Sequence, residues 1–362
     1  HDNHVDFCLG AMRSLDASAA RLCVAPVTDE HGEVLLPTRW LPYDDLVIAV
    51  GSTANHFNVP GAAELTISLD QPADAERLRL RLLKLLSAAD VRKGVAGVGV
   101  VRIVIIGGGA TGVELAAELR EASMVHARYG VRRLDPLLDV QITLLEGADR
   151  ILAPLPEKVA QAAARLLQAR HVQVVTGCKV TRITAQQVKD SAGRVYASDL
   201  VVWAAGIRAP EVLGGLGLPT GRSGQLLVSD RLRVHGHTNI HAMGDCAACP
   251  TAAGGWVPPR AQAAHQQASY LLAVLTCRTR GQSAPDQAFV YRDHGALVSL
   301  GTQSSVGQLM GSLFGSTWFV QGLLARGLYA SLHLMHHQAV LGSLRTAVMA
   351  LARFLVRRTT PL

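Results

Sequence analysis

Residues 101–119, VRIVIIGGGATGVELAAEL, constrain the fold more than any other stretch of this 362-residue chain. An apolar strand leads into a helix through Gly107, Gly109 and Gly112, which are spaced as G-x-G-x-x-G. The spacing alone is common, but between a strand and a helix it is typical of a dinucleotide-binding turn. Gly107 permits the tight turn, Gly109 lets the backbone approach a phosphate, and Gly112 lets the helix pack closely on the strand. We therefore predict that the N-terminus of this helix binds a pyrophosphate.

Strands and helices are expected to alternate around this turn. Buried strands are predicted over 46–50, 102–106, 141–146, 172–176 and 200–204, helices over 73–88, 111–122 and 157–169, and a hairpin over 179–197. Such alternation predicts an α/β fold with a parallel, doubly wound sheet.

A weak internal repeat indicates two nucleotide-binding modules. Segments 43–52 (YDDLVIAVGS) and 197–207 (ASDLVVWAAGI) share an Asp, an apolar run, small residues and a glycine, which is Gly51 in one and Gly206 in the other. The second segment closes the module that opens at Gly107, but no glycine-rich turn precedes the first. We therefore expect that the chain lacks the amino-terminal part of its first module. An ordinary buried strand at 43–52 is the alternative.

Two acidic residues near the turn are candidate ligands. Glu146 ends the strand ITLLE, where an acid typically binds the ribose of the dinucleotide, although it lies further along the chain than the usual spacing of about 20 residues. An acid here favours NADH over NADPH, because it repels a 2′-phosphate. Glu114 is expected in the first helical turn, either as a favourable N-terminal acid or as a proton relay beside a nicotinamide.

A second strand end, NIHAMGDCAACP (239–250), carries Gly244 and Asp245. An Asp at this place suits hydrogen bonding to a ribityl chain or a phosphate-bearing ligand. Cys246 and Cys249 form a C-x-x-C pair, which is found in redox dithiols and zinc sites. Because the chain has no second pair and no histidine cluster at zinc spacing, we predict buried cysteines and no metal site.

The segment 258–271, PPRAQAAHQQASYL, is predicted to begin a helix after two prolines. Gln262, His265, Gln266 and Ser269 then recur at helical spacing. This polar stripe is either a solvated helix face or, near a flavin, a set of hydrogen-bonding groups for a quinone.

The carboxy-terminal tail is basic and amphipathic. Residues 318–362 contain no Asp or Glu, and the chain carries a net charge of +7. An apolar stripe recurs at helical spacing through Leu344, Val348, Leu351 and Leu355. The uncharged run 327–344 contains three histidines, so we predict an interfacial helix on an anionic membrane rather than a transmembrane helix. Packing against the protein's own core is the alternative, and no nucleic-acid-binding motif accompanies the charge.

Together these features resemble the type II NADH:quinone oxidoreductases, single-subunit respiratory NADH dehydrogenases that do not pump protons. The resemblance covers essentially the whole chain and rests on VRIVIIGGGATGVELAAEL, DLVVWAAGI, AMGDCAACP, VPPRAQAAHQQAS and YRDHGALVSLG, in that order. It implies two Rossmann-type domains, the first incomplete, and a C-terminal amphipathic helical membrane-binding region. We expect the FAD-binding domain at 1–70 and 230–285, the NADH-binding domain at 71–229 and the membrane-binding region at 286–362.

The resemblance also implies roles for individual residues. Glu114 is expected near the nicotinamide, and Gln262 and Gln266 are expected to line the quinone site. Residues expected to bind FAD or NADH are Gly51, Gly107, Gly109, Gly112, Glu146, Gly206, Gly244, Asp245 and Ala263. The implied reaction passes a hydride from NADH to FAD and then two electrons to a membrane quinone. The implied place is the cytoplasmic face of a bacterial inner membrane, as a peripheral protein without a nucleic-acid partner, and a homodimer is open.

Two other functions stay open at this point. A pyridine nucleotide–disulfide reductase shares the nucleotide-binding modules but ends in a dimerisation domain with an active-site His, unlike this basic tail. The second alternative is a catalytically inactive, truncated protein that binds NADH and membranes without turnover. Because the first glycine-rich turn is missing, we expect the 362-residue chain alone to retain little flavin.

Overall fold

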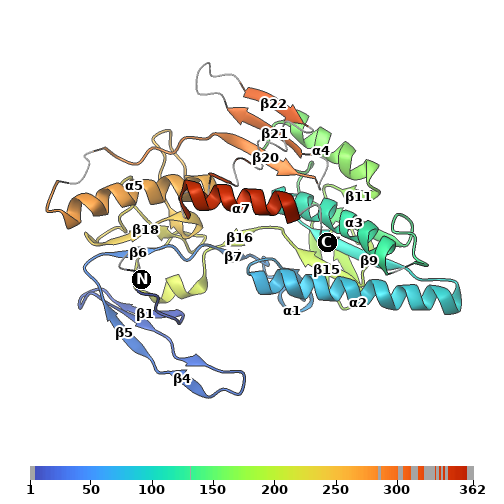
Figure 1. Ribbon diagram of the computed structural model, residues 1–362, viewed down its shortest axis with the longest axis horizontal. Helices are drawn as coiled ribbons and strands as arrows, with labels where there is room; N and C mark the ends of the chain where they lie inside the picture. The colour runs from blue at the N-terminus through green and yellow to red at the C-terminus, as the bar shows by residue number, and fades with distance from the viewer. Residues whose placement is uncertain are drawn as a thin grey trace. The chain divides into compact units, whose positions relative to one another are not determined.

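The computed structural model describes residues 5–130, 132–283, 287–300, 305–310, 317–321 and 341–356, with five further residues between 331 and 338 (Figure 1). The chain forms two compact units, which we call the first unit (His1–Thr53 and Ile207–Asp293) and the second unit (Ala54–Gly206 and His294–Leu362).

The second unit is built on a parallel five-stranded sheet. Its strands are β8 (Ile67–Ser68), β9 (Val101–Ile106), β10 (Val140–Leu145), β11 (Val172–Val175) and β15 (Leu200–Trp203), in the order β11-β10-β9-β15-β8. Every neighbouring pair runs parallel. Runs of Val, Ile and Leu suit strands that are covered on both faces. The predicted α/β fold with a parallel sheet is confirmed.

Four helices belong to the same part of the second unit: α1 (Ala62–Leu65), α2 (Pro72–Ala96), α3 (Ala110–Tyr129) and α4 (Glu157–Ala169). The predicted bounds of α4 are confirmed, but α2 and α3 end later than the predicted residues 88 and 122. α2 continues to Ala96 and α3 to Tyr129, where Gly97 and Gly130 provide the C-caps. The predicted hairpin is the small antiparallel sheet β12 (Val180–Ile183), β13 (Gln187–Asp190) and β14 (Val195–Ala197).

The carboxy-terminal part of the second unit was expected to be helical, but it also contains strands. An antiparallel sheet forms from β20 (Gly295–Ser299), β21 (Ser305–Met310) and β22 (Thr317–Gln321), followed by α7 (Ser343–Val356). Val298 and Leu300 are buried in the same core as the parallel sheet. Burial of these two side chains explains why 294–300 joins the second unit.

The first unit contains short strands and one long helix. β1 (Met12–Asp16), β2 (Arg21–Val24) and β5 (Arg39–Pro42) form an antiparallel sheet, and β3 (Val27–Thr28) pairs with β4 (Val34–Leu36). β6 (Leu46–Ile48) pairs in parallel with β18 (Ile240–Ala242), and β17 (Leu226–Leu227) pairs with β19 (Ala247–Ala248). The remaining elements are β16 (Ile207–Arg208), the 3-10 helices η1 (Glu211–Gly215) and η2 (Gly244–Cys246), and α5 (Ala261–Thr279). The short strand β7 (Thr53–Ala54) lies at the boundary between the two units in the sequence.

The unit boundaries differ from the expected domain boundaries at residues 70, 229 and 285. Residues 54–70 belong to the second unit because β8 is an edge strand of its sheet. Residues 207–229 belong to the first unit because Leu213 and Leu226 are buried in its core.

A buried cation fastens α3 to the loops around the sheet of the second unit. Arg120 is only 1 % exposed. Its guanidinium donates hydrogen bonds to the carbonyl oxygens of Val140 (2.8 Å), Arg170 (2.9 Å), His171 (3.0 Å) and Pro136. Burial lowers the pKa of Arg120 to about 10, so the side chain stays charged at neutral pH.

We predict that Arg120→Met lowers the free energy of unfolding by about 3 kcal/mol, because four carbonyls lose their donor. Urea denaturation measures the change. Arg79→Met is the matched control, since Arg79 makes only an exposed ion pair with Glu76, and its loss should cost less than about 0.5 kcal/mol. Equal costs for the two substitutions would contradict the role given to Arg120.

Candidate functional site

The glycine-rich turn lies between β9 and α3, as predicted. Gly107 has a φ of +109°, and a Cβ there would lie 2.3 Å from the carbonyl oxygen of Ala204. A Cβ on Gly112 would lie 1.9 Å from the carbonyl oxygen of Gly107. By contrast, no atom lies within 4 Å of a Cβ built on Gly109. Packing therefore requires two of the glycines, whereas Gly109 faces open space that a ligand could occupy.

A pocket of about 250 Å³ opens beside this turn. It is lined at the carboxyl ends of three neighbouring strands by Ile106 and Gly107, by Leu145 and Glu146, and by Trp203 and Ala205. Ligands of open α/β sheets bind at this edge, and the free N–H groups of a helix N-terminus favour an anion there.

Glu146 closes one side of this pocket, where the sequence predicted a ribose ligand. Its carboxylate accepts hydrogen bonds from the backbone N–H groups of Gly108 (2.5 Å) and Ala148 (2.7 Å). The glycine spacing did not predict a role for Gly108, where a Cβ would lie 2.9 Å from the Cβ of Glu146. Lys179 also lines the pocket and was not anticipated.

Glu114 lies in the second turn of α3 and not in the first, because the helix begins at Ala110. A favourable interaction with the helix N-terminus is therefore weaker than the sequence suggested. Its Oε1 accepts a hydrogen bond from the backbone N–H of Ser299 (2.9 Å). Burial raises the pKa of Glu114, so this carboxyl holds its proton to a higher pH than an exposed one.

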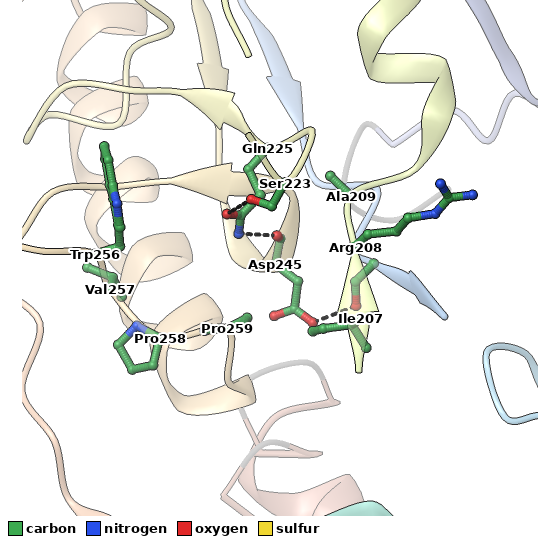
Figure 2. A pocket seen from close by; sticks show the side chains of 11 residues that line it. Ile207, Arg208, Ala209, Ser223, Gln225, Asp245, Trp256, Val257, Pro258 and Pro259 are labelled. Atoms are coloured by element: carbon green, nitrogen blue, oxygen red, sulfur yellow. Dashed lines mark hydrogen bonds between the residues drawn. The ribbon is translucent and has the colours of Figure 1, made fainter. Parts of the chain in front are cut away.

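A second pocket, of about 220 Å³, lies in the first unit (Figure 2). The side chain of Asp245 lines it, and one carboxylate oxygen accepts a hydrogen bond from the hydroxyl of Ser52 (2.9 Å). The Gln225 amide donates to the backbone carbonyl of Asp245 (2.8 Å). Ser52 follows β6 and Asp245 follows β18. Because these two strands pair in parallel, the segments that follow them lie at the same edge, which brings Ser52 and Asp245 together.

Two predicted glycines flank this pocket in left-handed conformations. Gly51 has a φ of +69°, with no atom within 4 Å of a built Cβ, and Gly244 has a φ of +72°. The N–H of Gly244 donates to the side-chain carbonyl of buried Gln267 (2.7 Å), a residue that sequence reasoning missed. Predicted Ala263 is buried on the same helix, α5.

Gln262 and Gln266, also on α5, both contact the segment that follows the helix. The Gln262 amide donates to the carboxylate of Asp293 (3.1 Å). Gln266 makes two bonds to Arg292, donating to its carbonyl (2.8 Å) and accepting from its N–H (3.0 Å). The structure thus brings the two predicted glutamines together on one segment.

Cys246 and Cys249 are both buried thiols of the first unit. Cys246 donates to the carbonyl of Met243 (3.2 Å), and Cys249 to that of Pro250 (3.6 Å). Burial raises the pKa of both thiols, to about 11 for Cys249. A raised pKa opposes thiolate chemistry. Within the described residues, no group of three or more His, Cys, Asp and Glu side chains is arranged to hold a metal ion.

The predicted apolar stripe of the tail is exposed on α7. Leu344, Val348, Leu351 and Leu355 are 78, 61, 59 and 56 % exposed. Arg345 is exposed on the same helix, whereas Arg357 and Arg358 lie outside the described residues. No described helix is long and apolar enough to cross a membrane.

Comparisons with known proteins identify the family of the chain. The pyridine nucleotide-disulphide oxidoreductase family matches residues 3–268. A type II NADH:quinone oxidoreductase of Haemophilus influenzae is 36 % identical, over 93 % of this chain and 78 % of its own length. Demethylphylloquinone reductase NdbB of Synechocystis is 34 % identical, over 78 % of this chain and 66 % of its own length.

Among solved structures, NDH2 from Plasmodium falciparum in complex with NADH has the same fold. It superposes with a TM-score of 0.74 at 17 % identity, covering 92 % of this chain and 80 % of that one. The expected oxidoreductase class, and the expected FAD and NADH cofactors, are confirmed at the level of the family. The turn, the Glu146 pocket and the identity to relatives lead to one conclusion: the chain belongs to the type II NADH:quinone oxidoreductases, within the pyridine nucleotide-disulphide oxidoreductases.

Proposed function

We propose that the second unit binds NADH, that the first unit binds FAD, and that the electrons pass to a membrane quinone. The observation that carries this proposal is the pocket at the carboxyl edge of the parallel sheet, where Glu146 lies beside the turn 107–112. An anion-binding helix N-terminus beside an acceptor for ribose hydroxyls is typical of dinucleotide-binding sites.

In this account the open space at Gly109 receives the pyrophosphate of NADH. The N-terminal N–H groups of α3 bind its oxygens, and Glu146 accepts hydrogen bonds from the hydroxyls of the adenosine ribose. The carboxylate is already oriented by Gly108 and Ala148. It repels a 2′-phosphate, so the protein prefers NADH to NADPH.

The residues of the first unit suit FAD. Left-handed Gly51 and Gly244 have no side chains, so a ligand can approach the backbone beside Asp245, and the carboxylate can accept hydrogen bonds from ribityl hydroxyls. FAD, when bound, supplies an acceptor for the hydride of NADH and a donor of two electrons. The chain's own residues position and orient the reacting groups.

Glu114, Gln262 and Gln266 take the roles that the family resemblance implied. We place the Glu114 carboxyl near the nicotinamide, where a pKa raised by burial suits proton transfer. We place the quinone beside α5, where Gln262 and Gln266 hold the segment of Arg292 and Asp293.

We further propose that α7 lies in the interface of an anionic membrane. Its apolar stripe is exposed, and its described sequence, Ser343–Val356, contains no acidic residue. A helix of this kind binds by apolar burial together with attraction to anionic lipids. The cytoplasmic face of a bacterial inner membrane remains our prediction for the location, as does the lack of a nucleic-acid partner.

Gly109→Ala is expected to weaken NADH binding at least about 10-fold, because the new methyl group fills the space proposed for the pyrophosphate. Isothermal titration with NADH measures the change. Gly130→Ala is the matched control at the other end of α3, since a Cβ there also meets no atom. Both variants should unfold at nearly the same temperature as the parent. Unchanged NADH affinity in Gly109→Ala would count against this pocket.

Substituting Gln262 and Gln266 together by Ala should slow quinone reduction at least about 10-fold and change flavin reduction by NADH less than about 2-fold. Stopped-flow absorbance, with FAD added in excess, separates the two half-reactions. Gln161→Ala, which removes an exposed amide bonded to Glu157 on α4, should change neither. Equal losses in both half-reactions would exclude a specific role toward the quinone.

Replacing Leu344, Val348 and Leu351 by Gln should weaken binding to vesicles of anionic lipid at least about 10-fold, because three apolar side chains no longer enter the interface. Co-sedimentation measures the bound fraction. Val95→Gln, a change at an 86 % exposed residue of α2, is the control and should bind like the parent. Parent-like binding by the triple variant would show that α7 does not carry the attachment.

A further inference from the structure

An aromatic ring forms one wall of the pocket in the second unit, and neither the glycine turn nor Glu146 explains it. Phe57 lines this pocket together with Gly107 and Ala205, yet its side chain is 58 % exposed. Ligand pockets are lined predominantly by apolar and aromatic side chains that become covered when the ligand binds. The exposed ring therefore has the properties of a ligand contact.

Gly206 makes room for this ring. A Cβ on Gly206 would lie 3.0 Å from Cζ and 3.2 Å from Cε2 of Phe57. The backbone of Gly206 is not in the left-handed region, so its own conformation does not require glycine. A Cβ at this position would instead move the Phe57 ring by a few tenths of an ångström.

The backbone at Phe57 is held in an unusual conformation. Phe57 and the next residue, Asn58, have φ angles of +48° and +55°. Bulky residues seldom adopt this region, and such strain gathers at ligand sites. The N–H of Phe57 donates to Oδ1 of Asn55 (3.0 Å).

The segment that carries Phe57 is itself fastened to the end of β15. The N–H of Asn55 donates to the carbonyl of Gly206 (2.9 Å). The indole N–H of Trp203 donates to the carbonyl of Asn55 (2.9 Å). These bonds fix where the ring lies relative to the pocket.

The order of the strands tells which half of the dinucleotide lies nearest the ring. Glu146 follows β10, the turn at Gly107 follows β9, and Gly206 follows β15, in the spatial order β10-β9-β15. If Glu146 binds the adenosine ribose and the turn binds the pyrophosphate, the ring over Gly206 lies on the side away from adenosine.

We propose that Phe57 is a positioning residue that packs against the nicotinamide-bearing half of NADH. The inference rests on the proposed function, because it takes this pocket to hold NADH. Gly206 then contributes by leaving space for the ring rather than by touching the cofactor.

Calorimetric titration with NADH and with ADP, which lacks the nicotinamide half, tests the proposal in the full chain. Phe57→Ala should weaken NADH binding about 10-fold and change ADP binding less than about 2-fold. Phe57→Tyr should restore NADH affinity to within about 2-fold of the parent. Gly206→Ala, whose methyl group shifts the ring by a few tenths of an ångström, should weaken NADH binding more than ADP binding, but by less than Phe57→Ala does.

Two controls distinguish a failure of the role given to Phe57 from a failure of the proposed NADH site. Phe7→Ala removes an 87 % exposed ring outside both pockets and should leave both affinities unchanged. Glu146→Ala should weaken NADH and ADP alike. Unchanged NADH affinity in Phe57→Ala, or equal weakening of NADH and ADP, would overturn the inference. Failure of the parent protein to bind either ligand would instead count against the proposed function.

Discussion

The contact between Gly112 and the carbonyl oxygen of Gly107 is the constraint on which the rest of the second unit depends. A Cβ on Gly112 would lie 1.9 Å from that oxygen, so only a hydrogen fits. The contact holds the start of α3 against the end of β9, next to Gly107, which lines the pocket. Glu146 is placed by the same turn, since it binds the N–H of Gly108.

Much of the parallel sheet could be predicted from the sequence, because strands covered on both faces are continuous apolar runs. The bounds of α4 were also predictable from its amphipathic pattern. The ends of α2 and α3 were not, because both helices extend beyond the apolar pattern that predicted them, α2 even past Gly94, before Gly97 and Gly130 cap them. The sheet of β20, β21 and β22 was not predicted, because runs of five or six residues are too short to distinguish a strand from part of a helix by their periodicity.

The residues of the site also fall into those that the sequence could predict and those that it could not. Gly107, Gly112 and Glu146 could be found from local spacing, because strand, turn and helix are consecutive in the chain. Gln267 and Phe57 could not, because each acquires its meaning from a distant partner: Gly244 for the first and Gly206 for the second. The unit boundaries also depend on contacts between distant segments, such as the pairing of β8 with β15.

Different parts of the chain are proposed to bind NADH, the flavin and the quinone. In the proposed function the second unit binds the hydride donor and the first unit binds the flavin, while Gln262 and Gln266 hold a segment beside α5 where we place the acceptor. The buried, high-pKa thiols of Cys246 and Cys249 are poorly suited to a disulfide reaction. The most direct test follows NADH oxidation by the purified protein with added FAD, comparing a soluble quinone with a soluble disulfide as acceptor. The account predicts oxidation that depends on the quinone, whereas oxidation that depends on the disulfide and not on the quinone would contradict it.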